Sequence, residues 1–518
     1  MDLFLWVLLA VGSLIFWLYQ LNKDYYVLAF FSPRVKTKDG RPVESIAPVA
    51  NGKTIFGNGF DLYGSNEAEI FQHSRTHARK IRTSYIEYGM GLPMYNIIDP
   101  EVVELILNDQ NLINKSVVYD FLHPALRTGL LTSTDKKWHS RRKILTPTFH
   151  FNILGHFEEV FKTESLKFVE QFADSSEICI SASELIPKFT LNSICETAMG
   201  VKLDDMAEKG NIYRKNFAQI EKRFIKRISN PFYWNNTIYN LFGAKEDAPF
   251  LNIIHNFSSE IIAKRRILLQ DALQNRQISQ GDGDDDIYFN KKQRFAMLDT
   301  LIFAEKDGLI DHQGICEEVD TLMFEGFDTT SMGLIFGLMN MSLYADKQEL
   351  CYQEINEFIE NDFSNLDINQ IAKLKYLDCF VKETMRLFPS VPFMGRQVHR
   401  KTELANGLIL PAGTQILMHV FDIHRHPKHW DAPNEFRPER FFTENSEGRH
   451  IYAYIPFSAG QRNCIGQKYA MLEMKTLLIV VLKKFRILPL VDPKSFVFNS
   501  GITLRTNNNI QVKLVRRA

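Results

Sequence analysis

Apolar residues recur at spacings of three and four along much of this 518-residue chain, which is the period of one face of an α-helix. The clearest examples are residues 153–173 and 249–274. A third segment, residues 313–345, contains no proline, and at about 1.5 Å per residue a helix of that length spans about 50 Å. This pattern predicts a mainly helical protein with one helix long enough to cross a whole domain.

The N-terminal region is apolar and carries almost no charge. Residues 3–21 include no charged side chain, and this stretch approaches the roughly 20 residues that a helix needs to cross a bilayer. A cleaved signal peptide is the alternative, but such peptides usually have a positive start and a small-residue cleavage site. This chain instead begins with Asp2 and continues into Asn22 and Lys23. We therefore expect residues 1–22 to be a single transmembrane anchor.

A basic segment that contains prolines follows the anchor. Its cationic residues are Lys23, Arg34, Lys36, Lys38 and Arg41. Cations beside a span tend to stay in the cytosol, so the rest of the chain is expected there. The six cysteines show no paired spacing, which also favours reduced thiols in a cytosol-like compartment. We expect residues 23–50 to be a linker and residues 51–518 to be the catalytic domain.

The charge balance gives no support for a nucleic-acid partner, because Lys plus Arg and Asp plus Glu both number 61.

Two local clusters raise the question of a metal site. The acidic residues 280–286 lack the closing glutamate of a calcium-binding EF-hand loop, so we interpret them as a solvated loop. Three histidines lie between His424 and His429, but Pro427 interrupts any helix that would align them. A zinc site is therefore disfavoured.

One cysteine lies in a glycine-bounded loop before a long apolar run, in the sequence Phe457-Ser-Ala-Gly-Gln-Arg-Asn-Cys464-Ile-Gly466. Gly460 and Gly466 can adopt backbone conformations closed to other residues, which would let the chain turn around the sulfur. The amides of a helix that begins after Gly466 would favour a thiolate. Arg462 could pair with a carboxylate of a cofactor. The alternative is a buried free cysteine in a turn.

The pattern Phe-x-x-Gly-x-Arg-x-Cys-x-Gly resembles the haem-ligand loop of the cytochromes P-450, and the resemblance covers the chain from about residue 51 onward. It implies a mainly α fold with a smaller β region, in which a long central helix lies over the haem. It also implies haem b, iron protoporphyrin IX, as the cofactor, with Cys464 as the metal ligand.

The long helical segment contains Glu325-Gly-Phe-Asp328-Thr329-Thr330. Gly326 has no side chain, so the helix could lie close to a macrocycle or open to admit dioxygen. Asp328 and Thr329 resemble the acid–alcohol pair of the family, which implies a catalytic role in proton relay. The alternative is that the threonine hydroxyl bonds back to the preceding helical turn.

Residues 318–330 and 145–153 resemble family 4 of the cytochromes P-450, particularly its insect members. A carboxylate at Glu325, after three apolar residues, is costly to bury without a partner, and a salt bridge is the ordinary solution. In family 4 the matching glutamate can form an ester to a haem methyl group. The resemblance therefore implies that Glu325 binds the cofactor, either through an ester or as a free carboxylate.

Further motifs imply contacts with the haem and with the core beside it. The cations and the indole expected at the haem propionates are Trp138, Arg142, Arg396 and Arg462. The triad expected to fix the haem-side core consists of Glu383, Arg386 and Arg440. Residues expected to line the substrate pocket are Met323, Phe324, Phe393 and Met394, although such residues are more often part of a core.

The resemblance implies a monooxygenase that inserts one oxygen atom of O2 into an unactivated C–H bond of a lipophilic substrate. Family 4 suggests a fatty acid oxidised at or near its terminal carbon, and a xenobiotic substrate is the alternative. The implied partners are NADPH-cytochrome P-450 reductase and cytochrome b5, at the endoplasmic reticulum membrane. Two other classes stay open: a peroxide isomerase that needs no reductase, and a non-enzymatic haem binder.

Overall fold

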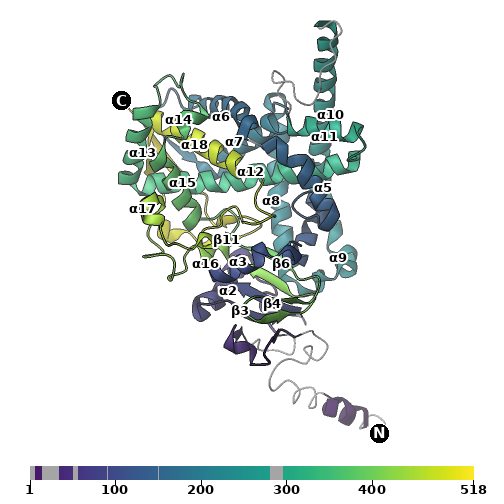
Figure 1. Cartoon of the computed structure of the whole chain (residues 1–518). Coiled ribbons are helices and arrows are strands. Elements are labelled where there is room, and N and C mark those ends of the chain that lie inside the picture. The colour runs from purple at the N-terminus through teal and green to yellow at the C-terminus, as the bar shows by residue number, and fades with distance from the viewer. Residues whose placement is uncertain are drawn as a thin grey trace.

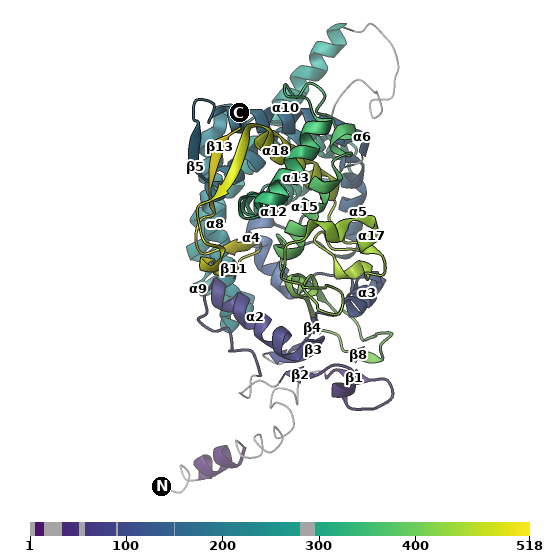
Figure 2. The same cartoon turned by 90° about the vertical axis from the view of Figure 1, so that its left-hand side faces the viewer.

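One long helix crosses the helical part of the molecule, and a five-stranded sheet lies at the other end of the body (Figure 1). The computed structural model describes residues 6–14, 34–50, 57–89, 92–149, 151–279 and 296–517. In both Figure 1 and Figure 2 the C-terminus lies at the end of the body opposite the five-stranded sheet. The mainly helical fold with a smaller β region is the one that the sequence predicts.

The longer helices of the described body are α2 (Glu67–Ile81), α3 (Pro100–Asn108), α5 (Asp135–Leu145), α6 (Phe151–Glu170), α7 (Ala182–Thr197), α8 (Ala207–Ser229), α9 (Asn236–Phe242), α10 (Ala244–Ser279), α11 (Met297–Lys306), α12 (His312–Leu343), α13 (Ala345–Phe358), α15 (Lys375–Leu387) and α18 (Gln467–Lys484). The short helices are α4 (His123–Leu126), α14 (Ile368–Ile371), α16 (Val420–Ile423) and α17 (Thr443–Ser446). The predicted helices at residues 153–173, 249–274 and 313–345 are confirmed as α6, α10 and α12.

Helix α12 owes its length and position to its sequence. The Asp311 side chain caps its start by accepting a hydrogen bond from the Gly314 amide at 2.8 Å. No proline interrupts the following residues, and most side chains of the helix are buried on every face. It packs against α7, α10, α15 and α18, so its neighbours surround it on all sides. A helix in this position can contribute side chains to cavities within the core.

The strands are β1 (Lys36–Thr37), β2 (Val49–Ala50), β3 (Tyr85–Gly89), β4 (Leu92–Ile97), β5 (Glu177–Ser181), β6 (Met394–Gln397), β7 (Thr402–Glu403), β8 (Leu408–Leu410), β9 (Gln415–Met418), β10 (Phe485–Pro489), β11 (Phe498–Ser500), β12 (Leu504–Thr506) and β13 (Gln511–Arg516). The largest sheet has the order β2-β3-β4-β9-β6. Smaller sheets have the orders β1-β8-β7, β10-β13-β5 and β11-β12.

Part of the segment expected to be a linker is built into the folded body. Strand β1 pairs with β8, and β2 pairs with β3 of the five-stranded sheet. Val35 and Ala47 are buried in the core beside that sheet. Strands of two residues have no periodicity of their own, so only the tertiary structure reveals that residues 35–50 belong to the body.

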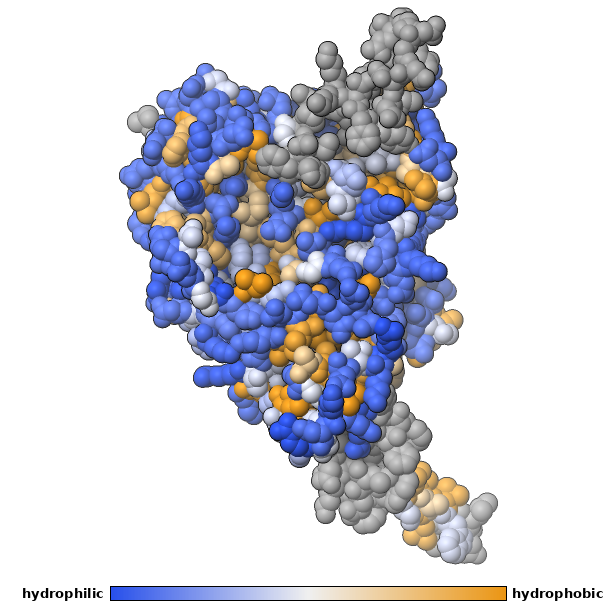
Figure 3. Space-filling model, in the orientation of Figure 1, coloured by the Kyte–Doolittle hydropathy of each residue, from blue (hydrophilic) through white to orange (hydrophobic). Residues whose placement is uncertain are grey.

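The predicted anchor is described only in part. Residues 6–14 are helical and exposed, and Figure 3 shows apolar side chains over them. Among the described residues, no helix combines the length and the apolar character that a membrane span requires. The rest of residues 1–22 lies outside the described residues, as does the acidic stretch 280–286.

A buried carboxyl group lies in the helical core behind the cysteine loop. Glu473 belongs to α18 and is 0% exposed. Burial raises its pKa well above the usual range, and the Ser193 hydroxyl on α7 offsets only part of this effect. A glutamate in this environment keeps its proton in the folded state at a pH where the unfolded chain has lost it.

The folded chain should therefore lose stability through Glu473 as the pH rises. Because its folded pKa is raised, the loss begins near the unfolded pKa and continues up to the folded pKa, with a slope of at most about 1.4 kcal/mol per pH unit. The variant Glu473→Gln removes this dependence and should raise the unfolding free energy at pH 8 by about 1–3 kcal/mol, and by less at pH 5. Urea unfolding at pH 5 and at pH 8 measures this difference in unfolding free energy. Glu444→Gln, at an exposed position, is the control.

Candidate active site

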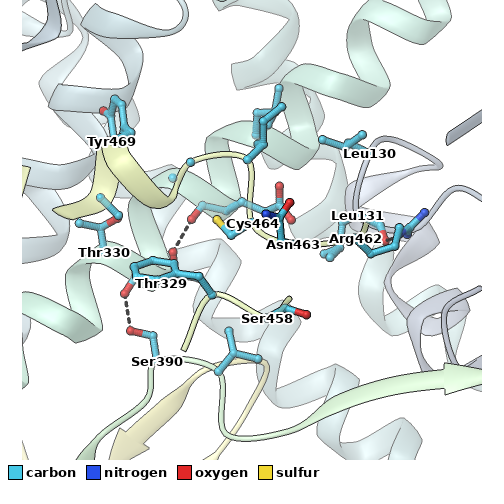
Figure 4. Close-up of a pocket in the computed structure, with 18 of the residues that line it drawn as sticks. Leu130, Leu131, Thr329, Thr330, Ser390, Ser458, Arg462, Asn463, Cys464 and Tyr469 are labelled. Atoms are coloured by element: carbon cyan, nitrogen blue, oxygen red, sulfur yellow. Dashed lines mark hydrogen bonds between the residues drawn. The ribbon is translucent and has the colours of Figure 1, made fainter. Parts of the chain in front are cut away.

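A cavity of about 210 Å³ lies between α12 and the cysteine loop. Helix α12 contributes Glu325, Gly326 and Thr329 to its wall, and the cysteine loop contributes Cys464. Figure 4 shows Cys464 and Thr329 among the side chains that line it, together with Ser390, whose hydroxyl donates a hydrogen bond to the Thr329 carbonyl at 2.7 Å. The long helix and the candidate metal ligand therefore border one cavity.

The cysteine loop is held in place by its own backbone and by one glycine. The Cys464 amide donates to the Phe457 carbonyl at 2.9 Å, and the Asn463 amide donates to the Gly460 carbonyl at 3.2 Å. Gly460 has a φ of 68°, and a Cβ atom at this position would lie 2.2 Å from the Leu107 carbonyl oxygen. Both the conformation and the close approach require glycine.

Gly466 does not need the conformational freedom that the sequence suggested. It is the N-cap of α18 with a φ of −90°, which other residues also adopt, so this expectation was wrong. The Gly466 amide does bond to the cysteine side chain and lowers its pKa. Burial has the larger effect, and together with the nearby Glu325 it raises the pKa of Cys464 to about 12. The protein's own groups therefore favour the thiol over the thiolate at this position.

Basic side chains surround the same cavity. Lys115, Arg142 and Arg462 line it, and the guanidinium of Arg396 is close enough to lower the pKa of Lys115. Burial is the main reason why the pKa of Lys115 lies well below its ordinary value and that of Arg462 falls to about 9. Of the described residues that line this cavity, only Glu325 brings a carboxylate.

This charge distribution fits a haem group. Several buried cations around one carboxylate favour a ligand that brings negative charge, and haem b brings propionate carboxylates. The thiol and an apolar wall that includes Leu130 and Ile465 fit its iron and its flat ring. The residues present are therefore suited to hold this cofactor.

Each expected propionate-binding residue has an anchor of its own. Arg462 donates to the carbonyls of Ser133 and Leu131 at 2.9 and 3.0 Å, and its guanidinium lies 4.6 Å from the centre of the Trp138 ring. Arg142 donates to the Asn463 carbonyl at 3.0 Å and to the Asn463 side chain at 2.7 Å.

Two further cations complete this group. Arg396 is 2% exposed and donates to the Gly395 carbonyl at 3.0 Å. Lys115 was missed by the sequence reasoning, because no motif around it marks a cofactor contact.

The surroundings of Glu325 act in opposite directions on the pKa of its carboxyl group. Burial raises its pKa to about 7, while Lys115, Arg462 and Arg142 act in the opposite direction. It borders the cysteine cavity and also a second cavity of about 300 Å³. The carboxyl group is therefore available to a molecule in either space.

The two members of the expected acid–alcohol pair face different surroundings. Thr329 lines the cavity, and its hydroxyl donates to the Glu325 carbonyl at 2.6 Å, which is the back-bonded arrangement considered as the alternative. Asp328 is 3% exposed and is not among the residues that line either cavity. Its carboxylate accepts hydrogen bonds from Arg505 at 2.6 Å and from Thr503 at 2.7 Å.

Gly326 lines the cavity and also allows two helices to pack closely. A Cβ atom at this position would lie 2.6 Å from the side chain of Ile194 on α7. The missing side chain therefore lets α7 pack closely against α12, which the sequence reasoning did not consider.

The three residues of the expected triad are in contact below the cavity. Arg386 donates to both carboxylate oxygens of Glu383, at 2.7 and 2.8 Å, and Arg440 donates to one of them at 3.3 Å. Glu383 and Arg386 are both 0% exposed. Arg386 also donates to the carbonyls of His424 and Pro433, so this network ties α15 to the segment that precedes the cysteine loop.

The residues expected in the substrate pocket separate into three environments. Met394 lines the cysteine cavity, while Phe324 and Phe393 line the second cavity. Met323 is 0% exposed within the helical core and borders neither cavity. The second cavity shares Glu325 and Thr329 with the first, so the two spaces meet at α12.

The histidine cluster does not form a metal site. No group of three or more His, Cys, Asp or Glu side chains in the described part of the chain could hold a metal ion. His424 instead accepts a hydrogen bond from the Ile455 amide at 2.8 Å, and burial lowers its pKa to about 3. A neutral imidazole suits this acceptor role.

Comparisons with known proteins agree with this geometry. The family model described as "Cytochrome P450" matches residues 48–514. Cytochrome P450 4p1 of Drosophila melanogaster is 64% identical over 513 residues, which cover 99% of both chains. Probable cytochrome P450 4ac1 of the same species is 47% identical over 99% of this chain and 98% of its own length. Cytochrome P450 4V2 of Mus musculus is 34% identical over 99% of both chains.

The close approach at Gly460 predicts an unusually sensitive position. Gly460→Ala should lower the unfolding free energy by about 2–4 kcal/mol, because it combines left-handed strain with a clash against the Leu107 carbonyl. Gly448→Ala is the matched control, since Gly448 also has a positive φ of 75° but has no neighbour within 4 Å. It should cost only about 1–2 kcal/mol. Urea unfolding measures the stability of both variants, and the haem-to-protein ratio measures how much cofactor each retains. Equal losses of unfolding free energy in Gly460→Ala and Gly448→Ala would contradict the role of the Leu107 contact.

Proposed function

The chain belongs to the cytochrome P450 family, and from this premise we propose that it is a membrane-anchored haem-thiolate monooxygenase that oxidises a lipophilic substrate. Its relatives in family 4 make an aliphatic chain, as in a fatty acid, the first candidate, with attack at or near the terminal carbon. The observation that carries the proposal is the meeting of Cys464, Glu325 and a group of buried cations at one cavity.

Haem b in this cavity would supply the activation of dioxygen, with one oxygen atom inserted into a C–H bond and the other reduced to water. Cys464 would bind the iron as a thiolate, and its side chain is exposed to the cavity that would receive the cofactor. Lys115, Arg142, Arg396 and Arg462 would bind and orient the propionates, and the Trp138 indole would support Arg462.

Proton delivery would depend on Thr329 and Asp328. The Thr329 hydroxyl borders the cavity and can hold a proton at Oγ1, once it turns away from the Glu325 carbonyl. Asp328 would supply that proton from the far side of α12. Its carboxylate would first have to exchange one of its partners, Arg505 or Thr503, for a hydrogen bond on the cavity side.

Electrons would come from NADPH through a membrane-bound reductase, with cytochrome b5 as a second donor. We place the catalytic domain on the cytosolic side of the endoplasmic reticulum membrane, as the basic residues after the predicted anchor suggest. A xenobiotic substrate is a second candidate, because much of the wall of the second cavity is apolar. A peroxide isomerase that needs no reductase is less well supported, since it would have no use for Thr329 and Asp328 as a proton relay.

The reduced protein should bind carbon monoxide with the Soret band of a thiolate complex. Cys464→Ala removes the sulfur ligand and should abolish this band, whereas exposed Cys179→Ala should leave it intact. The absorption spectrum of the dithionite-reduced, carbon monoxide-treated full chain makes the measurement. NADPH consumption with added reductase then separates a monooxygenase from an isomerase. A histidine-like band in the unmodified protein would contradict ligation by Cys464.

We also propose that Glu325 forms an ester with a haem methyl group. One carboxyl oxygen bonds to the methyl carbon, the carboxyl proton and one methyl hydrogen leave, and the two electrons pass to the dioxygen that the monooxygenase reaction already uses. Haem should therefore stay with the protein in acidified acetone and should be released from Glu325→Gln. Glu305→Gln, an ion-paired glutamate on α11, is the control. A haem that the solvent extracts from the unmodified protein after turnover would contradict the ester.

A further inference from the structure

The second cavity extends from α12 to one face of the five-stranded sheet. It shares Glu325 and Thr329 with the cysteine cavity, and at its other side it borders Glu87 on β3 and Asn96 on β4. A molecule that reaches Thr329 from this space would therefore extend toward the sheet. The sheet would then contact the end of that molecule that is remote from Thr329.

The register of the sheet explains why polar side chains face this cavity. Tyr85 pairs with Asn96, and Glu87 pairs with Met94, across the antiparallel strands β3 and β4. Directly paired residues point to the same side of a sheet, and alternate residues of one strand share a side. All four of these residues border the cavity. The wall is thus a sheet face on which a carboxylate and an amide interrupt apolar and aromatic side chains.

The hydrogen bonds of Glu87 and Asn96 fix what this wall can offer. Asn96 Nδ2 donates to Glu87 Oε2 at 3.0 Å, and His419 Nε2 donates to Asn96 Oδ1 at 3.0 Å. His77 Nδ1 lies 2.6 Å from Glu87 Oε1, and this bond raises the pKa of His77, so His77 acts as the donor and the carboxylate oxygen as the acceptor. Each carboxylate oxygen can accept another bond, and the Asn96 amide has one N–H left. The wall therefore offers acceptors and one donor side by side.

This combination suits a hydroxyl group and disfavours a carboxylate. A hydroxyl can donate to Glu87 and accept from Asn96, so both wall groups are satisfied by one atom of the substrate. A carboxylate can only accept, and it would bring a second negative charge beside Glu87 in a half-buried site, where screening by solvent is weak. The His77 imidazole is already bonded to Glu87 Oε1, so its N–H is not free to pair with a second carboxylate.

We propose that the substrate is an aliphatic or alicyclic alcohol whose hydroxyl binds Glu87 and Asn96, while the opposite end of the molecule reaches Thr329. This inference rests on the proposed monooxygenase function, but it replaces the fatty acid as the first candidate substrate with a neutral alcohol. Glu87 and Asn96 are specificity-determining residues in this arrangement. They do not touch the reacting carbon, so they select the substrate without taking part in the chemistry.

Two ligands of equal chain length test the proposal, dodecan-1-ol and dodecanoate. The dissociation constant of each is read at pH 7.5 from the change in the haem absorption spectrum of the full-chain holoenzyme. We expect the alcohol to bind at least about tenfold more tightly than the carboxylate. Glu87→Gln keeps the size of the side chain but removes its charge, and should reduce this ratio to about threefold or less. Exposed Glu447→Gln is the control and should leave the ratio unchanged.

Equal or tighter binding of dodecanoate by the unmodified protein would overturn the proposal, as would a ratio that Glu87→Gln leaves unchanged. The first comparison needs no variant, so it holds even if Glu87→Gln fails to fold. Only preparations that give the thiolate–carbon monoxide band are titrated. A preparation without that band counts against the proposed function, whereas a wrong preference in a preparation with the band counts against the alcohol site alone.

Discussion

The buried positive charge around the cysteine cavity is the constraint on which the rest of this structure depends. Arg396 and Arg462 are buried and Lys115 and Arg142 are half-buried, and burial lowers the pKa of each. Such a group costs several kcal/mol per ion unless negative charge comes close to it. Glu325 supplies only part of that charge. The cavity is therefore suited to an anionic ligand.

Other buried charges of the molecule are satisfied by the protein itself. Arg386 and Arg440 share the Glu383 carboxylate, and every remaining direction of the Arg386 guanidinium is used by a backbone carbonyl. Arg505 likewise bridges Asp328 and Glu221. These networks join segments that are far apart in the sequence, so they fix the frame. Charged side chains that pair within the fold hold the framework together. Charged side chains that face a cavity mark the cofactor site.

The sequence predicts the elements that depend on local chemistry, and it fails where a partner lies far away. Helix α12 follows from a proline-free apolar segment behind the Asp311 cap, and the turn of the cysteine loop follows from Gly460. The orientation of Asp328 does not follow from the nearby sequence, because its partners Thr503 and Arg505 lie in a strand region far away along the chain. Lys115 has no motif around it. Its importance appears only when the fold brings it beside Arg396 and Arg462.

One continuous segment of the chain connects the wall of the second cavity to the cysteine loop. Strand β4 presents Asn96 to the second cavity, and the chain then enters α3, whose Leu107 carbonyl meets Gly460 in the cysteine loop. Residues 92–108 thus border the second cavity at one end and contact the cysteine loop at the other. In the proposed function, this short piece of backbone would contact the substrate and also support the loop that holds the iron ligand. The core beside the sheet is closely packed, so we expect a displacement of β4 to be felt at the cysteine loop.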